Sequence, residues 1–177
     1  MSKHVLIGVT GSIAAYKACE LVRLFVTGEY DTHVAMTNAG TKFVTPLTFQ
    51  TLSGNPVRVE LFDDPSQKKP FHISMAELCD IIVVAPCTAN VIAKIAHGIA
   101  DDYLTSTISA FKKPIVIAPA MNVNMWENPA TQDNIKTLRK RGLHIIEPDE
   151  GDLACGIKAK GRLPSPAQIY QTAIELL

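Results

Sequence analysis

VLIGVTGS, residues 5–12, is the stretch that decides the fold class of this chain. Residues 5–10 are mostly apolar and do not alternate strictly with polar residues, a pattern typical of a strand covered on both faces in a parallel sheet. Gly11 and Ser12 predict a tight turn, and the apolar spacing over residues 14–25 predicts a helix. The stretch therefore predicts the order of strand, turn and helix from which α/β folds are built.

The same unit recurs along the chain. Further strands are predicted at residues 32–37, 57–61, 80–85, 114–118 and 143–146, and further helices at about residues 39–52, 91–100, 101–111, 130–141 and 167–177. Gly142 is a natural residue just past a helix end, and Ser165 followed by Pro166 predicts the start of the last helix. Six strands alternating with helices predict a three-layer α/β/α sandwich around a six-stranded parallel sheet of the Rossmann or flavodoxin-like type.

The composition predicts one globular domain over residues 1–177, because 47% of the residues are hydrophobic and no linker-like stretch divides the chain. Seventeen basic residues balance seventeen acidic ones, which argues against nucleic acid as a partner. No stretch reaches the length of a membrane span, and the first residues lack the pattern of a signal peptide. The four cysteines, at positions 19, 79, 87 and 155, form no metal-ligand array, so we expect reduced thiols, a cytoplasmic setting and no metal.

Ligands of open α/β sheets bind beyond the carboxyl ends of the strands. The predicted ends here, residues 10–12, 37–39, 85–90 and 118–122, are rich in small, hydroxyl and amide residues. Ser12 and Thr88 each open a helix, where they could help to receive a phosphate or could act only as helix caps. Because the dinucleotide pattern GxGxxG and the pattern GxxxxGK[ST] are both absent, a mononucleotide with a planar ring is expected, and FMN fits better than NAD.

Two further segments are candidates for substrate contact. MNVNMW, residues 121–126, crowds two amides and three large apolar groups at a strand end, so that Asn122 could bind a carboxylate or an amide; an aromatic-anchored loop is the alternative. Residues 151–166 contain three glycines and two prolines and predict a loop that carries Cys155 and the basic residues Lys158, Lys160 and Arg162. These charges could neutralise a substrate phosphate or could simply be solvated.

Taken together, these segments resemble the homo-oligomeric flavin-containing cysteine decarboxylases over nearly the whole chain. GSIAAYK at residues 11–17 and APCTAN at residues 85–90 are similar to the flavin segments of that family, with Val91 where the family usually has Thr. APAMNVNMW at residues 118–126 resembles its PAMN motif, and His72 falls where the family places a catalytic histidine. LACG at residues 153–156 resembles the flap of the branch that acts on 4′-phosphopantothenoylcysteine.

The resemblance implies FMN-dependent decarboxylation of 4′-phosphopantothenoylcysteine to 4′-phosphopantetheine in coenzyme A biosynthesis, by a homotrimer or homododecamer. It assigns His72 as base or electrostatic partner, Cys155 as proton donor, and residues at about 150–164 as a flap over the substrate. The implied FMN contacts are Gly11, Ser12, Ile13, Thr37, Asn38, Phe43, Pro86, Thr88, Ala89, Asn90 and Ala120. The implied substrate contacts are Asn122, Met125, Ala154, Lys158 and Arg162.

Three other functions stay open from the sequence. A peptidyl-cysteine decarboxylase would share the flavin segments but act on the end of a peptide. A regulatory member of the same family would bind flavin without catalysis, and an apoprotein or flavin-transfer protein would not turn over a substrate at all. In the oligomer that the resemblance implies, apolar residues of the helix at 101–111 could serve subunit contact or could belong to the core.

Overall fold

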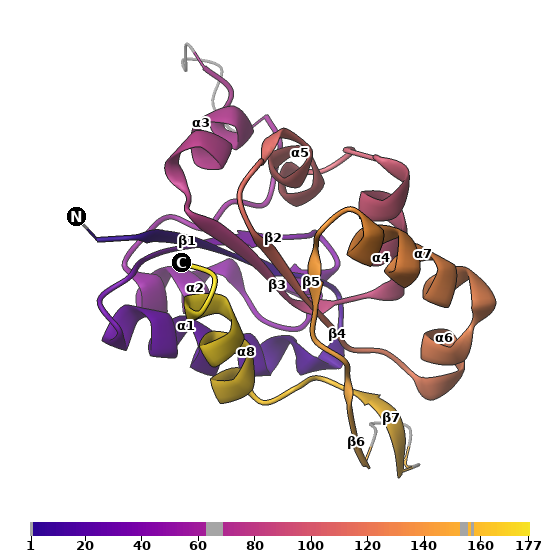
Figure 1. Cartoon of the computed structure of the whole chain (residues 1–177). Coiled ribbons are helices and arrows are strands. Elements are labelled where there is room, and N and C mark those ends of the chain that lie inside the picture. The colour runs from indigo at the N-terminus through magenta and orange to yellow at the C-terminus, as the bar shows by residue number, and fades with distance from the viewer. Residues whose placement is uncertain (1, 63–68, 153–155, 157) are drawn as a thin grey trace.

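The computed structural model describes residues 2–62, 69–152, 156 and 158–177 (Figure 1). Its centre is a five-stranded sheet with the order β2-β1-β3-β4-β5, in which every neighbouring pair is parallel. The strands are β1 (His4–Val9), β2 (Asp31–Met36), β3 (Ile81–Cys87), β4 (Ile115–Pro119) and β5 (His144–Ile145). The predicted α/β fold with a parallel sheet is confirmed.

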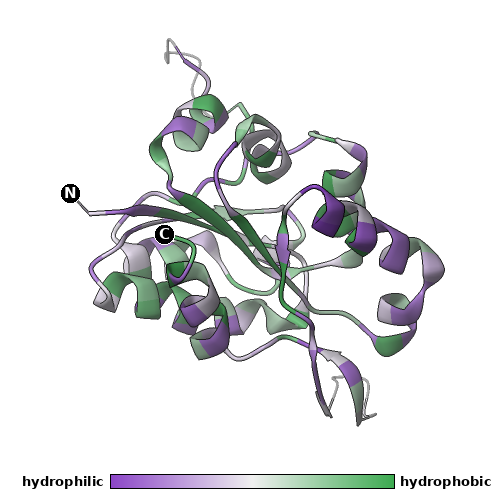
Figure 2. Cartoon of the chain, viewed as in Figure 1, coloured by the Kyte–Doolittle hydropathy of each residue, from purple (hydrophilic) through white to green (hydrophobic). Residues whose placement is uncertain are grey.

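Helices cover both faces of this sheet and make two separate cores. One face packs against η1 (Ile13–Tyr16), α1 (Lys17–Thr27), α2 (Pro46–Ser53) and α8 (Pro166–Ile174). The other packs against α3 (Phe71–Leu78), α4 (Ala89–His97), α5 (Tyr103–Ala110), α6 (Val123–Glu127) and α7 (Pro129–Lys140). Figure 2 shows the apolar central strands between helices that carry both apolar and polar residues. Every residue of β3 is buried, as expected for a strand with helices on both sides.

The prediction of a sixth strand at residues 57–61 is wrong. Only Arg58 pairs with the sheet, through its N–H to the carbonyl of Val34 (3.0 Å) and its carbonyl to the N–H of Met36 (2.8 Å). Pro56, two residues before Arg58, has no N–H to donate, so the ladder of hydrogen bonds does not extend toward residue 56. The segment therefore makes a single parallel bridge beside β2.

The predicted loop at residues 151–166 is partly a β-hairpin. Strands β6 (Asp149–Asp152) and β7 (Lys158–Arg162) pair in antiparallel fashion and form a separate two-stranded sheet beyond the ends of β4 and β5. These strands consist mainly of charged and small residues, so the apolar pattern that marks a buried strand is missing. Ala154 and Cys155 lie outside the described residues, as does the side chain of Lys158.

The residues that start or end helices were predicted more reliably than the helices and strands between them. The Ser165 hydroxyl accepts a hydrogen bond from the N–H of Gln168 and Pro166 is the first residue of α8, while Gly142 has a φ of 86° just past α7. The stretch around His72, which carried no helix prediction, forms α3. Tyr103 to Ile108 are all buried in α5, so this helix belongs to the core. None of the helices in the described ranges is long and apolar enough to cross a membrane.

Candidate active site

Thr10, at the end of β1, joins the first and third strand ends. Its hydroxyl donates a hydrogen bond to the carbonyl oxygen of Pro86 (2.8 Å) and accepts one from the N–H of Thr88 (3.0 Å). The residue is completely buried. Sequence analysis placed Thr10 at a strand end, as a hydroxyl after an apolar run, but did not predict that it joins two strand ends. Its position fixes the start of α4 relative to the turn at Gly11.

Thr37 and Gly11 join the first and second strand ends. The Thr37 N–H donates to the carbonyl of Val9 (3.0 Å), and the Thr37 hydroxyl accepts from the N–H of Gly40 (3.2 Å). A Cβ atom at Gly11 would lie 2.5 Å from the Cβ of Ala39, so the two turns approach as closely as they do because residue 11 has no side chain. Three strand ends are thus held together by short-range polar contacts and close packing.

The hydroxyls of Ser12 and Thr88 cap the two helices that start at this edge. Ser12 Oγ accepts from the N–H of Ala14 (3.3 Å), and Thr88 Oγ1 accepts from the N–H of Val91 (3.4 Å). Helix capping was one of the two roles predicted for these hydroxyls, and the hydrogen bonds within the chain show that role. It leaves both helix starts pointing positive dipole ends toward the same edge of the sheet, where an anion is stabilised.

The side chains at this edge suit a planar aromatic ring that carries a phosphate. Ile13 is 57% exposed and Phe43 is 49% exposed, although both are large and apolar. Ile13 and Phe43 are two of the eleven predicted FMN contacts. The other nine are buried (Thr37, Pro86, Ala120), half-buried (Gly11, Ser12, Thr88, Ala89) or exposed (Asn38, Asn90). None of these eleven residues carries a charge, so nothing in the set would repel a phosphate. The predicted FMN contacts therefore fit the group chemically.

A hollow of about 320 Å³ beside Asn38 has a different character. Its wall includes Asp101 and Asp102, together with residues 59–62. Lys94 Nζ lies 2.6 Å from Asp101 Oδ1 and 3.4 Å from Asp102 Oδ2, so these two carboxylates are already paired with a cation. Three acidic residues, Glu60, Asp101 and Asp102, line this hollow and no Lys or Arg lines it, so it is a poor place for a phosphate. This favours the edge between Ser12 and Thr88.

The predicted substrate segment lies against the hairpin. The N–H of Met121 donates to the carbonyl of Gly161 (3.0 Å), which ties the end of β4 to β7. Asn122 is the N-cap of α6, and its Oδ1 accepts from the N–H of Asn124 (2.8 Å). Met125 is 49% exposed, whereas Trp126 is buried and anchors the helix. The candidate substrate contacts, Asn122 and Met125, and the buried anchor Trp126 thus lie on or next to one short helix.

Arg162 of the hairpin lies near Lys17. Both line a hollow of about 340 Å³ whose remaining wall is formed by Tyr16, Glu20, Asp149, Leu163, Ser165 and Pro166. Burial lowers the pKa of Lys17, and the positive charge of Arg162 lowers it further, while Asp149 and Glu20 oppose the shift. Two cations that repel each other in this way are stabilised when an anion binds between them.

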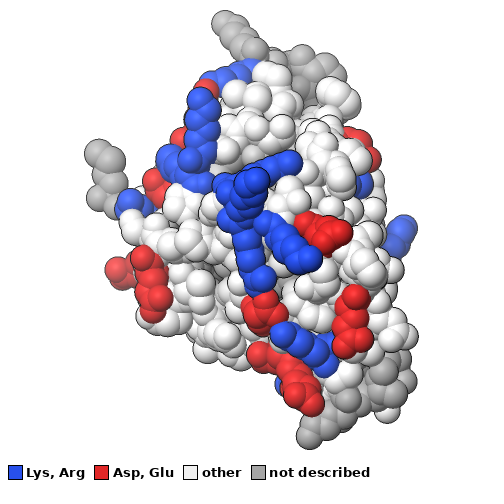
Figure 3. Space-filling model, turned by 45° about the vertical axis from the view of Figure 1, so that its right-hand side comes forward, with Lys and Arg blue, Asp and Glu red and all other residues white. Residues whose placement is uncertain are grey.

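Lys160 of the hairpin is paired within the chain. Its Nζ lies 2.7 Å from Oε2 of Glu147, and Arg139 of α7 pairs with the other carboxylate oxygen of Glu147. On the face shown in Figure 3, Lys and Arg side chains gather in the middle and acidic side chains lie below them. Of the basic hairpin residues whose side chains are described, Arg162 is the better candidate for a ligand phosphate.

His72 lies on α3, which is at the opposite end of the molecule from the β6–β7 hairpin (Figure 1). It is half-buried near the start of α3, and its Nδ1 is buried with no hydrogen-bond partner among the described residues. Helix α3 packs mainly against α5, and Arg58 lies over the ring of the neighbouring Phe71 at 3.7 Å from its centroid. No hydrogen bond within the described ranges joins His72 to the edge that carries Ser12 and Asn122.

The described cysteines, Cys19, Cys79 and Cys87, are free thiols. Burial raises the pKa of Cys79 to about 12 and also raises the pKa of Cys87, although Cys87 directly precedes Thr88 at the candidate site. A buried thiol of this kind is an inert packing group. Cys87 is therefore not a candidate for proton transfer.

The Flavoprotein family model matches residues 1–177. The chain belongs to the Flavoprotein family. It is 47% identical over 97% of its length to the coenzyme A biosynthesis bifunctional protein CoaBC of Bacillus subtilis (strain 168) and spans 42% of that relative. The chain thus covers less than half the length of the curated relatives that it matches.

Solved structures of similar length share its fold. A mutant of PPC decarboxylase complexed with pantothenoylaminoethenethiol matches with a TM-score of 0.86 and 30% identity, covering 97% of this chain and 96% of the other. The FMN-dependent cysteine decarboxylase SpaF also matches with a TM-score of 0.86, at 32% identity and with 98% and 95% coverage. The likeness to both kinds of decarboxylase extends over almost the whole chain.

Proposed function

We propose that this chain is an FMN-dependent decarboxylase that converts 4′-phosphopantothenoylcysteine into 4′-phosphopantetheine in coenzyme A biosynthesis. The observation that carries the proposal is the docking of the β6–β7 hairpin on the segment at residues 121–126, through the bond from Met121 to Gly161. This hairpin leads into and out of LACG at residues 153–156, the sequence that resembles the phosphopantothenoylcysteine branch. The flap of that branch would therefore start from a base already attached to the substrate segment.

FMN would lie at the edge between Ser12 and Thr88. The two helix starts favour its phosphate, while Ile13 and Phe43 offer apolar surface to its ring. When bound, FMN supplies a two-electron acceptor that gives the electrons back at the end, so the net reaction releases CO₂ and needs no external oxidant. The family match and the FMN-dependent neighbour SpaF support this assignment.

Asn122 would orient the substrate. Its Oδ1 is used as the cap of α6, so a substrate carboxylate would be met by the amide N–H₂ end of the side chain, which can only donate. Met125 would supply apolar contact, and Arg162 with Lys17 would receive the phosphate at the other end of the substrate. Together these contacts would hold the two charged ends of a single ligand.

His72 and Cys155 would handle protons. An imidazole titrates near neutral pH and can therefore accept a proton from the substrate or stabilise its charge. Cys155 would donate a proton to the enethiolate that is left after CO₂ departs, which allows the reaction to end in the saturated thiol. Ala154 beside it and Lys158 at the start of β7 would complete the flap.

Because no hydrogen bond in the described part of the chain joins His72 to the other site residues, a neighbouring copy is the natural source of that imidazole. Self-association as a trimer or a dodecamer would bring it there. Large apolar residues that are 49–69% exposed gather on η1, next to η2 (Gly40–Lys42) and on α2, and they offer a surface for such contact: Ile13, Tyr16, Phe43 and Leu47. We place the assembly in the cytoplasm, with no nucleic acid or membrane as partner.

The deciding experiment is incubation of the FMN-loaded protein with 4′-phosphopantothenoylcysteine, followed by mass detection of the product that has lost CO₂. A peptide that ends in cysteine, tested at the same concentration, distinguishes the second candidate function. The peptidyl-cysteine activity has its own support, because SpaF is a cysteine decarboxylase with 32% identity to this chain. Turnover of the peptide alone would overturn the proposal, and FMN binding without turnover of either compound would indicate a regulatory member.

A further inference from the structure

A compact cluster of three side chains, His4, Asp31 and His33, lies at the amino ends of β1 and β2. The candidate active site lies at the other end of the strands, beyond their carboxyl ends. His4 Nδ1 lies 2.9 Å from Asp31 Oδ2, and His33 Nε2 lies 3.3 Å from the same oxygen. All three atoms lie within 4.8 Å of one another. The proposed decarboxylase function makes no use of this cluster.

The parallel register explains how the cluster forms. His4 is directly opposite Asp31 on the neighbouring strand, and His33 follows Asp31 by two residues. Successive side chains of a strand point to opposite faces, so residues two apart share a face. All three side chains therefore stand on one face of the sheet, and the two imidazole rings are stacked with centroids 6.1 Å apart.

His4 Nδ1 and His33 Nε2 are both shielded from solvent. Each nitrogen lies within ion-pair distance of the same carboxylate oxygen, Asp31 Oδ2. Two imidazole nitrogens and a carboxylate oxygen that converge in this way are atoms of the kind that bind zinc.

Asn55 holds the carboxylate in place from the other side. Its Nδ2 donates to Asp31 Oδ1 (2.8 Å) and to the carbonyl of Thr32 (3.0 Å). Asp31 Oδ1 is therefore engaged, and Oδ2 is directed at the two imidazoles. A polar neighbour that orients a carboxylate in this way is the arrangement found around metal ligands in proteins.

We propose that His4 Nδ1, His33 Nε2 and Asp31 Oδ2 bind one divalent transition-metal ion of the zinc class. Two imidazoles and one carboxylate are a common ligand set for Zn²⁺, with water in the fourth position. Atoms bonded to zinc at about 2.0–2.1 Å in a tetrahedron lie roughly 3.4 Å apart. The two separations from Asp31 Oδ2, 2.9 and 3.3 Å, are within about half an ångström of that value, so small shifts of the two rings would complete the site.

A metal ion at this site would link the first residues of β1 and β2. β2 is an edge strand of the sheet, and its start is joined to β1 near residue 4. A metal ion bound only by the folded chain stabilises it. The sequence offers no spacing motif for the site, because residue 4 and residues 31–33 become neighbours only through strand pairing.

The test uses the FMN-loaded protein over residues 1–177 without a histidine tag, titrated with Zn²⁺ against a chromogenic chelator. We expect one competing site per chain in the unchanged protein and at least about 100-fold weaker binding in Asp31→Asn, which removes a ligand. Asn55→Ala leaves all three ligands in place but removes the bond that orients Asp31, together with the bond to the Thr32 carbonyl, and should weaken binding about tenfold. Bound Co²⁺ should give the visible absorption bands of a tetrahedral site in the unchanged protein.

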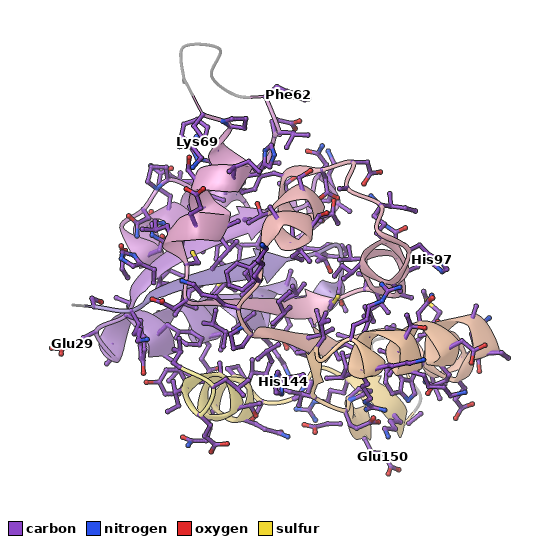
Figure 4. The ribbon with its side chains drawn as sticks, turned by 45° about the horizontal axis from the view of Figure 1, so that its top comes forward. Glu29, Phe62, Lys69, His97, His144 and Glu150 are labelled. Carbon is purple, nitrogen blue, oxygen red and sulfur yellow. The ribbon has the colours of Figure 1, made fainter. Side chains whose placement is uncertain are left out.

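His144→Ala is the matched control, because His144 is an exposed histidine on β5. Figure 4 places His144 well away from Glu29, which lies two residues before Asp31. This control should bind Zn²⁺ as the unchanged protein does, and the cysteines are the same in every variant. Flavin absorbance and the thermal transition without metal show whether each variant is folded; His4→Ala replaces Asp31→Asn if that variant is not. Equal Zn²⁺ affinity in the unchanged protein and a folded ligand variant would overturn the proposal.

Discussion

The hydroxyl of Thr10 donates a hydrogen bond to the carbonyl oxygen of Pro86 across 76 positions of the chain, at a distance of 2.8 Å. The Thr10 hydroxyl oxygen also accepts a hydrogen bond from the N–H of Thr88, so one buried side chain satisfies two backbone groups of another strand end. These contacts set the distance between the turn at Gly11 and the start of α4, the two places proposed to share one cofactor. A buried backbone group without a partner is costly, and Thr10 prevents that cost twice.

We expect Thr10→Val to destabilise the fold and to loosen the cofactor site. Leaving the Pro86 carbonyl and the Thr88 N–H without a partner should lower the free energy of unfolding by about 2 kcal/mol. The turn at Gly11 and the start of α4 should also be held less firmly relative to each other. FMN should therefore bind roughly tenfold more weakly, which corresponds to about 1.4 kcal/mol. Urea unfolding and flavin fluorescence titration measure the two effects. Thr10→Ser keeps the hydroxyl and should retain most of both properties; an unchanged valine variant would show that the contact is unimportant.

For His72→Asn we expect a fall in the decarboxylation rate of about 100- to 10,000-fold, the usual contribution of an acid–base group. FMN content should be normal, because none of the proposed flavin contacts of this chain involves residue 72. Steady-state rates and the flavin spectrum of the purified variant check both statements. His97→Asn is the control, since His97 is exposed on α4 and should not affect the rate. Loss of flavin together with activity would instead indicate a structural role for His72.

The sequence was sufficient to predict the five strands of the parallel sheet, since an uninterrupted apolar run such as residues 81–84 marks burial on both faces. It was misleading at residues 57–61, where Pro56 and the charged Arg58 and Glu60 reduce a strand-like pattern to one bridge. The hairpin β6–β7 could not be predicted from apolar periodicity, because its strands are polar and are held by their mutual pairing.

Prediction of the site had a similar limit. The caps Ser12 and Thr88 are local features, and a hydroxyl residue before a helical pattern reveals them. The contribution of Thr10 depends on a strand end 76 positions away, and the cluster of His4, Asp31 and His33 depends on strand register. Neither kind of relationship leaves a spacing pattern in the sequence.

Cys155→Ser should separate the two halves of the proposed reaction. Under anaerobic conditions one round of CO₂ release per bound FMN should still occur, but the product should stay at the enethiol and be lighter than 4′-phosphopantetheine by two hydrogen atoms, since a serine hydroxyl is a much weaker acid than a thiol. Mass spectrometry distinguishes the two products directly. Cys19→Ser, a half-buried thiol on α1, should give the normal product. Normal product at an unchanged rate from the Cys155 variant would remove it from the mechanism.

Glu147→Gln should reveal a pH-dependent contribution at the base of the hairpin. Burial raises the pKa of Glu147, but hydrogen bonds from Lys160 and Arg139 outweigh that effect and hold the pKa below its ordinary value of 4.5. A carboxyl group whose pKa is lowered by folding stabilises the protein above its unfolded pKa, and this stability is lost as the pH falls through the folded value.

The difference in unfolding free energy between the unchanged protein and Glu147→Gln should therefore be constant at neutral pH and shrink below about pH 4.5. Because the Glu147 side chain is 47% exposed, the difference should stay under about 1 kcal/mol. Urea unfolding across this pH range measures it. Asp133→Asn, which breaks an exposed pair with Lys136 on the same helix as Arg139, is a control expected to have a smaller effect. A difference that grows on acidification would contradict the assignment.

Gly161→Ala should detach the hairpin from the substrate segment. Residue 161 has a φ of 143°, and a Cβ atom there would lie 2.2 Å from the carbonyl oxygen of Met121, so an alanine forces the two strands apart. The bond from the Met121 N–H to the Gly161 carbonyl should then be lost, which hydrogen exchange at Met121 would report as faster exchange. Because the flap is proposed to start from this contact, the KM for 4′-phosphopantothenoylcysteine should rise by about tenfold, equivalent to one hydrogen bond's worth of about 1.4 kcal/mol.

The matched control for that variant is Gly98→Ala. Gly98 also has a positive φ, 70°, but a Cβ atom there would meet no neighbour within 4 Å. This substitution should cost about 1 kcal/mol of stability from backbone strain alone and leave the KM unchanged. If both variants lose stability equally and neither changes the KM, the hairpin is not the base of a substrate flap. A rise in KM confined to Gly161→Ala would show that substrate binding by the flap depends on the contact between Met121 and the carbonyl of residue 161.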